Sequence, residues 1–256
     1  MNCDLSLIDA HIHLDQYDEA TRSLVTEQSI VSDWISVSTD LRSAKRTLAL
    51  ARSDRRIHPA FGWHPEQPLL SEEAHEQLLR WIDRHHLSMV AVGEVGLPYY
   101  YRQQETVDEA LYEERLEPFI ERASRYDVPV ILHGVYEDVP TICQLVEKHS
   151  VRRAHFHWYK GDERSTDRIL SNGHVVSVTP DILYKERTRE LVKRVPLEQL
   201  LIETDGPWPY EGPLRSKATL PYLLMDVVRT IAQLKRLPEE EVAARITRTT
   251  RRFYDL

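Results

Sequence analysis

Short apolar runs recur along the whole chain, and segments whose apolar residues have helical spacing separate most of them. Eight runs predict strands, because short runs rich in Val, Ile and Leu are typical of strands buried on both faces. The predicted strands are Leu5–Ala10, Trp34–Ser38, Ile57–Gly62, Met89–Gly96, Val128–His133, Arg153–His157, His174–Val178 and Leu200–Thr204. The predicted helices are Glu72–His86, Glu105–Tyr126, Tyr136–Lys148, Arg164–Leu170, Lys185–Val195, Leu220–Lys235 and Glu239–Tyr254.

The alternation of strands and helices indicates the fold class. Strands that alternate with helices form a parallel sheet with right-handed crossovers, and eight such units favour a closed barrel over an open sheet. A length of 256 residues suits one barrel of this kind. The chain has no Pro-, Gly- or Ser-rich linker and no break in composition. We therefore expect an α/β fold with one domain over residues 1–256, a (β/α)8 TIM barrel.

Polar side chains that can bind metals gather at the C-terminal ends of the predicted strands, where barrel enzymes place their chemistry. They are His11, His13, His64, Glu94, His133, His155, His157 and Asp205. Side chains alternate along a strand, so His11 and His13 project to the same side. Two imidazoles on one face suit a divalent metal ion. The gathering of such residues at one rim therefore predicts a metal site.

Two carboxylates of this set lie in apolar surroundings. Glu94 interrupts the run Val90–Gly96, and Asp205 closely follows Leu200–Ile202. A carboxylate is costly to bury without a partner, and either a bound cation or an ion pair with Arg or Lys removes that cost. The neighbouring histidines favour the cation. The remaining histidines are expected to be structural or to face solvent: His58, His75, His85, His86, His149 and His174.

Composition and charge narrow the choice of partners. Apolar residues make up 41% of the chain and charged residues 29%, as expected for a folded domain. The formal charge of −8 argues against a broad, non-specific grip on nucleic acid, although bound divalent ions would reverse the sign at a local phosphate site. No apolar run approaches the roughly 20 residues of a membrane span. Cys3 and Cys143 are the only cysteines, so we expect no disulfide framework. Because the sequence also has no signal-peptide pattern, we expect a cytoplasmic protein. We further expect a monomer.

Six motifs follow one another along the chain: Asp9–Asp15 (DAHIHLD), Phe61–Glu66 (FGWHPE), Gly93–Leu97 (GEVGL), Ile131–His133 (ILH), His157–Gly161 (HWYKG) and Glu203–Pro207 (ETDGP). In residues and in order they resemble the TatD-like metal-dependent hydrolases, often called TatD-type deoxyribonucleases, within the amidohydrolase-like barrels. The resemblance runs from Asp9 to at least Trp208. It implies a TIM barrel of the metal-dependent hydrolase type that carries two divalent metal ions on its rim.

The resemblance also implies a role for each matching residue. One ion would be held by His11, His13, Glu94 and Asp205, and the other by Glu94, His133 and His157. Glu94 would bridge the ions, and Asp205 would orient or deprotonate the attacking water. His64 would contact the scissile phosphate. Tyr99 and Lys160, the latter at a position that departs from the family, are further candidates for binding substrate. Mixed nitrogen and oxygen ligands suit Zn, Mn, Co or Ni and, less comfortably, Mg.

Several positions depart from the family pattern or need a separate explanation. Pro98 stands where the family commonly has an acid, and Trp158 and Lys160 replace smaller residues, so that the rim loses a carboxylate and gains a cation. These changes do not alter the expected metal ligands. They affect which substrate the rim can bind. His155 shares a face with His157 one layer deeper, where we expect it to hydrogen-bond a carboxylate or to support the ligand shell.

The expected function is hydrolysis of a phosphodiester in DNA, with trimming from the 3′ end by a water that two metal ions activate. Aromatic residues near the rim could stack unpaired bases or pack within the fold: Trp63, Tyr99, Tyr100, Trp158 and Trp208. The alternative is a hydrolase of an ester or amide bond, for example in aminoacyl-tRNA or a small molecule, which the same chemistry permits. A non-enzymatic metal-binding or scaffold protein is disfavoured, because it would not need the complete ligand set together with His64.

Overall fold

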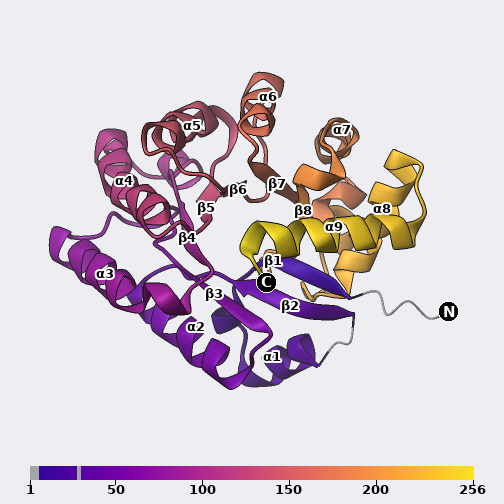
Figure 1. The fold of residues 1–256 in the computed structure, drawn as a ribbon, viewed down its shortest axis with the longest axis horizontal. Coiled ribbons are helices and arrows are strands. Elements are labelled where there is room, and N and C mark those ends of the chain that lie inside the picture. The colour runs from indigo at the N-terminus through magenta and orange to yellow at the C-terminus, as the bar shows by residue number, and fades with distance from the viewer. Residues whose placement is uncertain (1–5, 28–29) are drawn as a thin grey trace.

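The computed structural model describes residues 6–27 and 30–256, and within them eight parallel strands are surrounded by helices (Figure 1). The strands follow one another around the sheet in chain order, from β1 to β8. Their bounds are β1 Leu7–Ile12, β2 Val31–Ser36, β3 Ile57–Phe61, β4 Ala91–Gly96, β5 Val130–His133, β6 Ala154–Phe156, β7 Val175–Val178 and β8 Leu200–Ile202. All eight predicted strands are present, and the predicted barrel is confirmed.

The two ends of the sheet meet where the chain that follows β8 lies along β1. The N–H of Asp205 donates to the carbonyl of His11 at 2.9 Å. Next to this bond, the buried carboxylate of Asp9 accepts hydrogen bonds from the N–H of Thr204 at 2.9 Å and from its hydroxyl at 2.5 Å. These contacts bring the end of β1 and the segment after β8 to one place on the rim.

The helices cover the outside of the barrel (Figure 1). Their bounds are α1 Glu19–Thr26, α2 Leu41–Ser53, α3 Glu72–His85, α4 Glu109–Arg125, α5 Val139–Lys148, α6 Glu163–Ser171, α7 Glu186–Arg194, α8 Leu223–Lys235 and α9 Glu239–Tyr254. The seven predicted helices are present. α9 has the predicted bounds, and each of the others is shifted at one or both ends. The helix predicted from Glu105 begins at Glu109, because the carboxylate of Asp108 accepts the N–H of Leu111 at 3.1 Å and caps the helix there.

The sequence did not predict α1 and α2. Among the eight residues of α1 only Val25 is buried, so the helix has almost no apolar stripe. Its start is fixed instead by Asp18, whose carboxylate accepts the N–H of Thr21 at 2.8 Å. In α2 two of the four buried residues are Ser43 and Thr47, which blur the apolar pattern. Capping and polar burial therefore define elements that periodicity alone misses.

Apolar side chains pack in two regions. The larger core lies between the strands and the surrounding helices and includes Trp34, Phe61 and Phe119. The smaller core combines strand residues with the end of α9, and its members are Ala10, Ile35, Val37, Ala60, Ala91, Ile131, Val175, Leu201, Phe253 and Tyr254. The yellow helix α9 crosses one end of the barrel (Figure 1). Because α9 packs on the strand beginnings, it leaves the strand ends for the site.

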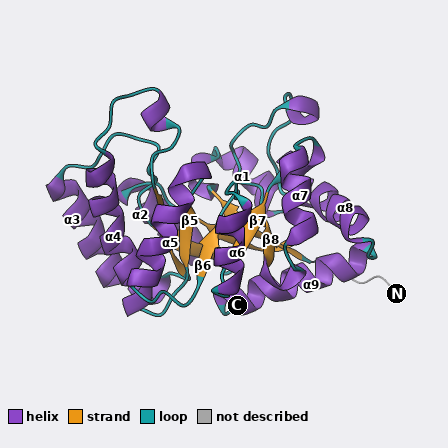
Figure 2. Ribbon diagram, turned by 90° about the horizontal axis from the view of Figure 1, so that it is seen from above, coloured by secondary structure: helices purple, strands orange, loops and turns teal. Residues whose placement is uncertain are grey.

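Long loops extend on the side of the strands that is opposite α9 (Figure 2).

Cys143 is buried and makes no disulfide, and Cys3 lies outside the described residues. Within the described ranges, no helix has the length and apolar character that a membrane crossing requires.

The carboxylate of Asp33, in β2, has three partners at the α9 end of the barrel. The hydroxyl of Ser32 donates to it at 2.6 Å and Arg251 of α9 at 2.7 Å, while Nε2 of His58 lies 2.9 Å away. Burial by itself would raise the pKa of Asp33, but the hydrogen bonds with His58 and Ser32 outweigh burial and lower the pKa to about 2.

We predict that Asp33→Asn lowers the free energy of unfolding by about 1–2 kcal/mol at pH 7. The carboxyl titrates at 3.8 when unfolded and at about 2 when folded. Its contribution is therefore complete above the unfolded pKa and is lost as the pH falls through the folded pKa. Urea unfolding should show a smaller difference between wild type and variant at pH 3 than at pH 7. An equal difference at both values would contradict a contribution from the charge.

Candidate metal centre

The first cluster of polar atoms lies where β1 meets the chain after β8. His11 and His13 project from the end of β1 and are completely buried. Nε2 of His11 lies 3.2 Å from Oε2 of Glu94 and 3.4 Å from Oδ1 of Asp205. Nε2 of His13 lies 3.4 Å from each of the same two oxygens. Two nitrogens and two oxygens thus face one another across a common centre.

This arrangement fits a divalent metal ion. Ligands about 2.1 Å from a tetrahedral zinc ion lie about 3.4 Å from one another, so the observed separations match one coordination shell. Among the described residues, none offers a hydrogen-bond partner to any of the four atoms, although all are buried. Buried polar atoms rarely lack a partner. A cation at the centre would satisfy all four, so the cluster could hold one metal ion.

The electrostatic field of the cluster also favours a cation. Burial lowers the pKa of an imidazole, because it disfavours the charged form. At His13, the nearby carboxylates of Asp205 and Glu94 outweigh burial and raise the pKa to about 9. At His11, burial prevails with help from the neighbouring His157, and the pKa is lowered. The two carboxylates therefore stabilise positive charge between the imidazoles.

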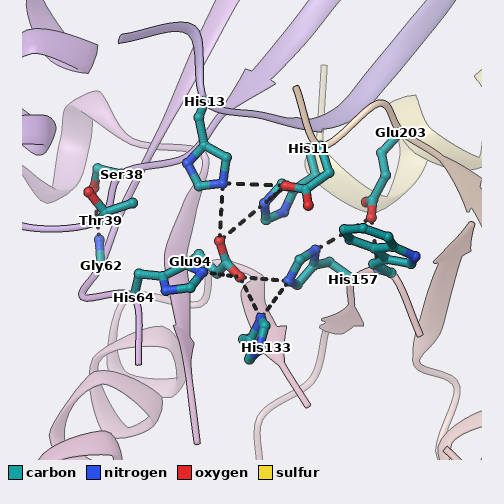
Figure 3. Close-up of polar contacts among 12 residues, drawn as sticks. His11, His13, Ser38, Thr39, Gly62, His64, Glu94, His133, His157 and Glu203 are labelled. Carbon is teal, nitrogen blue, oxygen red and sulfur yellow. Dashed lines mark hydrogen bonds and ion pairs between the residues drawn. The ribbon is translucent and has the colours of Figure 1, made fainter. Parts of the chain in front are cut away.

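A second cluster adjoins the first and shares Glu94 with it (Figure 3). Oε1 of Glu94 lies 2.6 Å from Nε2 of His157 and 3.0 Å from Nδ1 of His133. The two imidazole nitrogens are 3.2 Å apart. Because Oε2 of Glu94 faces the first cluster and Oε1 faces the second, this carboxylate could bridge two metal ions. The structure thus brings all six predicted ligands together, while their role as ligands stays a prediction.

His64 contacts the second cluster in a different way. Its Nε2 lies 3.4 Å from Oε1 of Glu94, and its Nδ1 accepts the N–H of Glu66 at 3.1 Å. Burial lowers the pKa of His64 to about 4, so the ring is neutral near pH 7. A neutral ring that accepts at Nδ1 carries its proton on Nε2. His64 therefore presents a hydrogen-bond donor to the site, which suits contact with a substrate oxygen better than coordination of a metal.

Sequence analysis gave no separate role to Glu66, which orients His133. One oxygen of Glu66 lies 2.9 Å from Nε2 of His133, and its carboxylate also accepts the N–H groups of Tyr100 at 3.0 Å and Tyr101 at 2.5 Å. This contact turns Nδ1 of His133 toward Glu94. A carboxylate behind a ligand imidazole is the usual way to fix its ring. The signal was present, since Glu66 closes the Phe61–Glu66 motif.

Glu203 is the second residue that sequence analysis left without a role. Its completely buried carboxylate accepts the N–H of Trp158 at 2.7 Å and lies 3.4 Å from Nδ1 of His157. Nε2 of His155 is 3.5 Å from the other oxygen. Burial would raise the pKa of Glu203, but the contacts with His155 and His157 outweigh it and lower the pKa. Glu203 therefore fixes His157 from behind, as Glu66 fixes His133.

His155 lies deeper in the barrel than His157. Its Nδ1 is 2.7 Å from the hydroxyl of Tyr254, which belongs to α9, and its other nitrogen faces Glu203. No atom of His155 is paired with Glu94. The position agrees with the expected support of the ligand shell from below, through a carboxylate.

A cavity of about 390 Å³ opens over the two clusters. The residues that line it are His64, Glu66, Tyr100, Gln104, His133, Val135, His157, Trp158, Lys160, Asp205 and Trp208. Tyr99, a predicted substrate contact, does not line this cavity: its ring lies 4.8 Å from that of Tyr136. Trp63 is buried and its ring stacks on Tyr112 at 5.5 Å, so it packs within the fold. The aromatic surface open to a ligand thus comes from Tyr100, Trp158 and Trp208.

Three comparisons relate the chain to known proteins. Residues 8–255 match the family described as TatD related DNase. A Haemophilus influenzae protein named only as a metal-dependent hydrolase is 40% identical over 252 residues, which covers 98% of this chain and 100% of that protein. A mouse protein named as a candidate deoxyribonuclease is 27% identical over 98% of this chain and 88% of its own length. The crystal structure of YjjV, a TatD homologue from Escherichia coli, has a TM-score of 0.85 at 26% identity and 98% coverage of both chains.

His157 and His155 allow a direct test of the clusters. We predict that His157→Ala loses one equivalent of bound metal and most of the activity, because its nitrogen faces Glu94. His155→Ala should keep its metal and lose only about 10–100-fold in activity, as is usual for a residue that supports a ligand. Metal titration followed by circular dichroism checks both variants. Loss of an equivalent in His155→Ala but not in His157→Ala would reverse the assignment.

Proposed function

We propose that this chain, which belongs to the TatD family of metal-dependent hydrolases, is a phosphodiesterase that removes nucleotides from the 3′ ends of DNA with two divalent metal ions. The observation that carries the proposal is the position of Glu94, whose two oxygens face two separate groups of imidazoles. Paired divalent ions that share a carboxylate are typical of enzymes that displace groups at phosphorus.

We assign the ligands of each ion from the two clusters. The first ion is assigned to His11, His13, Glu94 and Asp205, and the second to Glu94, His133 and His157. Imidazole nitrogen supplies half or more of each set, which favours Zn, Mn, Co or Ni over Mg. When bound, the ions would lower the pKa of the attacking water and neutralise charge on the phosphate.

Two side chains of the site contribute directly to the reaction, one by proton transfer and one by hydrogen bonding. Asp205 takes a proton from the attacking water as the water oxygen forms a bond to phosphorus. The bond between phosphorus and the 3′ oxygen of the preceding nucleotide breaks, and that oxygen takes up a proton. His64 donates its Nε2 proton in a hydrogen bond to a phosphate oxygen. The products are a nucleoside 5′-phosphate and a DNA chain shorter by one nucleotide.

Features of the cavity support a nucleic-acid end as the substrate. Tyr100, Trp158 and Trp208 offer ring surface beside the clusters, and unpaired bases stack on such surfaces. Lys160 adds a cation at the rim. The mouse relative named as a candidate deoxyribonuclease points the same way. The competing function is hydrolysis of a carboxylic ester or an amide, which the formal charge of −8 favours because a neutral or small substrate needs no cationic surface.

The decisive experiment combines metal analysis with an activity screen across Zn, Mn, Co, Ni and Mg. We expect close to two equivalents of metal per chain and stepwise shortening of a 5′-labelled single-stranded oligonucleotide from its 3′ end. A circular single strand, which has no 3′ end, should remain intact. Turnover of carboxylic esters or amides without turnover of DNA would overturn the proposal in favour of the competing function.

Asp205 supplies a sharper test of the mechanism. We predict that Asp205→Asn lowers kcat by about 10²–10⁴-fold and changes KM much less, because the amide keeps the shape of the carboxylate and cannot accept the proton. Metal content is measured alongside, since Asp205 also faces the first cluster. A variant that keeps its metal and changes only in KM would show that Asp205 binds substrate without serving as the base.

A further inference from the structure

A second pocket adjoins the cavity over the metal clusters. It measures about 410 Å³, and the residues that line it are Tyr100, Tyr136, Trp158, Lys160, Asp181, Tyr184, Lys185, Arg187, Thr188, Pro209, Tyr210 and Glu211. Tyr100, Trp158 and Lys160 also line the cavity, so these side chains form the wall between the two spaces. A ligand that reaches past Lys160 would occupy both.

We propose that this pocket, here called the outer subsite, binds the phosphate of the nucleotide that precedes the scissile bond. The preferred substrate is then a nucleotide chain that carries a further phosphate one nucleotide away from the metal ions. This inference deepens the proposed phosphodiesterase function and rests on it.

Lys160 is the first of two cations in the outer subsite without a counterion. Its ammonium nitrogen lies 3.9 Å from the ring centroid of Trp158 and 2.9 Å from the hydroxyl of Tyr100. Among the described residues, no carboxylate lies within ion-pair distance of it. Aromatic rings therefore hold the charge in place without neutralising it.

Arg187 is the second such cation. It lies over the ring of Tyr136 at 4.6 Å and donates hydrogen bonds to the backbone carbonyls of Lys160 and of Gly161, the latter at 3.1 Å. In the part of the chain that the structure describes, it has no carboxylate partner either. The backbone bonds use only one end of the guanidinium group, so its remaining N–H groups are available for a phosphate, which arginine binds in a forked geometry.

The acidic residues of the outer subsite are already engaged. Asp181 accepts hydrogen bonds from Nε1 of Trp158 and from the hydroxyl of Thr188, each at 2.9 Å and each on a different oxygen. Glu211 pairs with Lys185 at 3.4 Å. Hydrogen bonds from neutral donors leave the charge of Asp181 in place, so three cations, Lys160, Lys185 and Arg187, stand against two carboxylates in the outer subsite. One positive charge is left in excess, on a chain whose formal charge is −8.

The state of Lys160 is consistent with an anion site. Burial lowers the pKa of its ammonium group, Asp181, Tyr136 and Asp205 act against burial, and Arg187 adds a smaller effect that lowers the pKa. The two cations therefore repel each other across the pocket. A phosphate between them would relieve this repulsion and form charge-assisted hydrogen bonds, each stronger than a bond between neutral groups. The volume suits one nucleotide unit, and the rings of Tyr136 and Tyr184 offer surfaces for its base.

The test compares two substrates that differ by one phosphate, the thymidine dinucleotide TpT and its 5′-phosphorylated form pTpT. Loss of the intact dinucleotide is followed with the metal-loaded protein, because each cleavage of pTpT releases two molecules of thymidine 5′-phosphate and each cleavage of TpT releases one. We expect wild type to favour pTpT about tenfold in kcat/KM, chiefly through KM. Lys160→Met and Arg187→Met should each reduce the preference severalfold. Lys148→Met removes the same charge outside the outer subsite, at the end of α5, and should keep the preference.

A binding measurement decides the outcome independently of catalysis. In the presence of a chelator, calorimetry of the full chain should show tighter binding of thymidine 5′-phosphate than of thymidine. That difference should shrink in Lys160→Met and Arg187→Met and persist in Lys148→Met. Equal binding of the two ligands to wild type, or a phosphate preference that survives in both test variants, overturns the outer subsite. If neither dinucleotide is cleaved while the binding difference follows the variants, the subsite stands and the proposed phosphodiesterase function fails.

Discussion

The buried carboxylate of Glu94 is the constraint on which the whole site depends. It lies in the middle of β4, where every residue is buried, and both of its oxygens face imidazole nitrogens. An isolated carboxylate in such a place would be strongly disfavoured. Instead its pKa is well below the ordinary value, because the interactions with His157, His64 and His11 outweigh burial. The barrel tolerates this residue only because histidines from β1, from β5 and from the loops after β3 and β6 surround it.

The imidazoles around Glu94 need fixed rings, and the structure supplies a second layer of carboxylates for this purpose. Glu66 lies behind His133 and Glu203 lies behind His157. The ring of His157 also stacks on that of His11 at 4.0 Å, which joins the two clusters through their side chains. From Glu203 the contacts continue through His155 to Tyr254 on α9. The helix that packs on one end of the barrel therefore also supports ligands at the other.

Sequence reasoning predicted the strands and their polar ends because each rests on a local signal. A strand buried on both faces must be an apolar run, and a His, Glu or Asp at its end stands out against that run. The second layer is harder to assign from the sequence. Glu66 lies in the loop after β3 and Glu203 directly after β8, and each acquires its role only when the fold places it beside His133 or His157. Likewise, the choice of Tyr100 over Tyr99 as the cavity-lining ring depends on which way the chain turns after Pro98.

The departures at Trp158 and Lys160 show how this barrel separates chemistry from specificity. The predicted ligands lie on strands or directly after them, whereas Trp158 and Lys160 belong to the loop after β6. The ligand shell and the loop after β6 are nevertheless connected through one residue. Glu203 contacts the His157 ring and also accepts the N–H of Trp158 at 2.7 Å. Asp181 holds the other end of the indole at 2.9 Å. A substrate that contacts Trp158 therefore meets a surface anchored to the ligand shell, so binding at the rim and positioning at the metal ions depend on the same buried carboxylate.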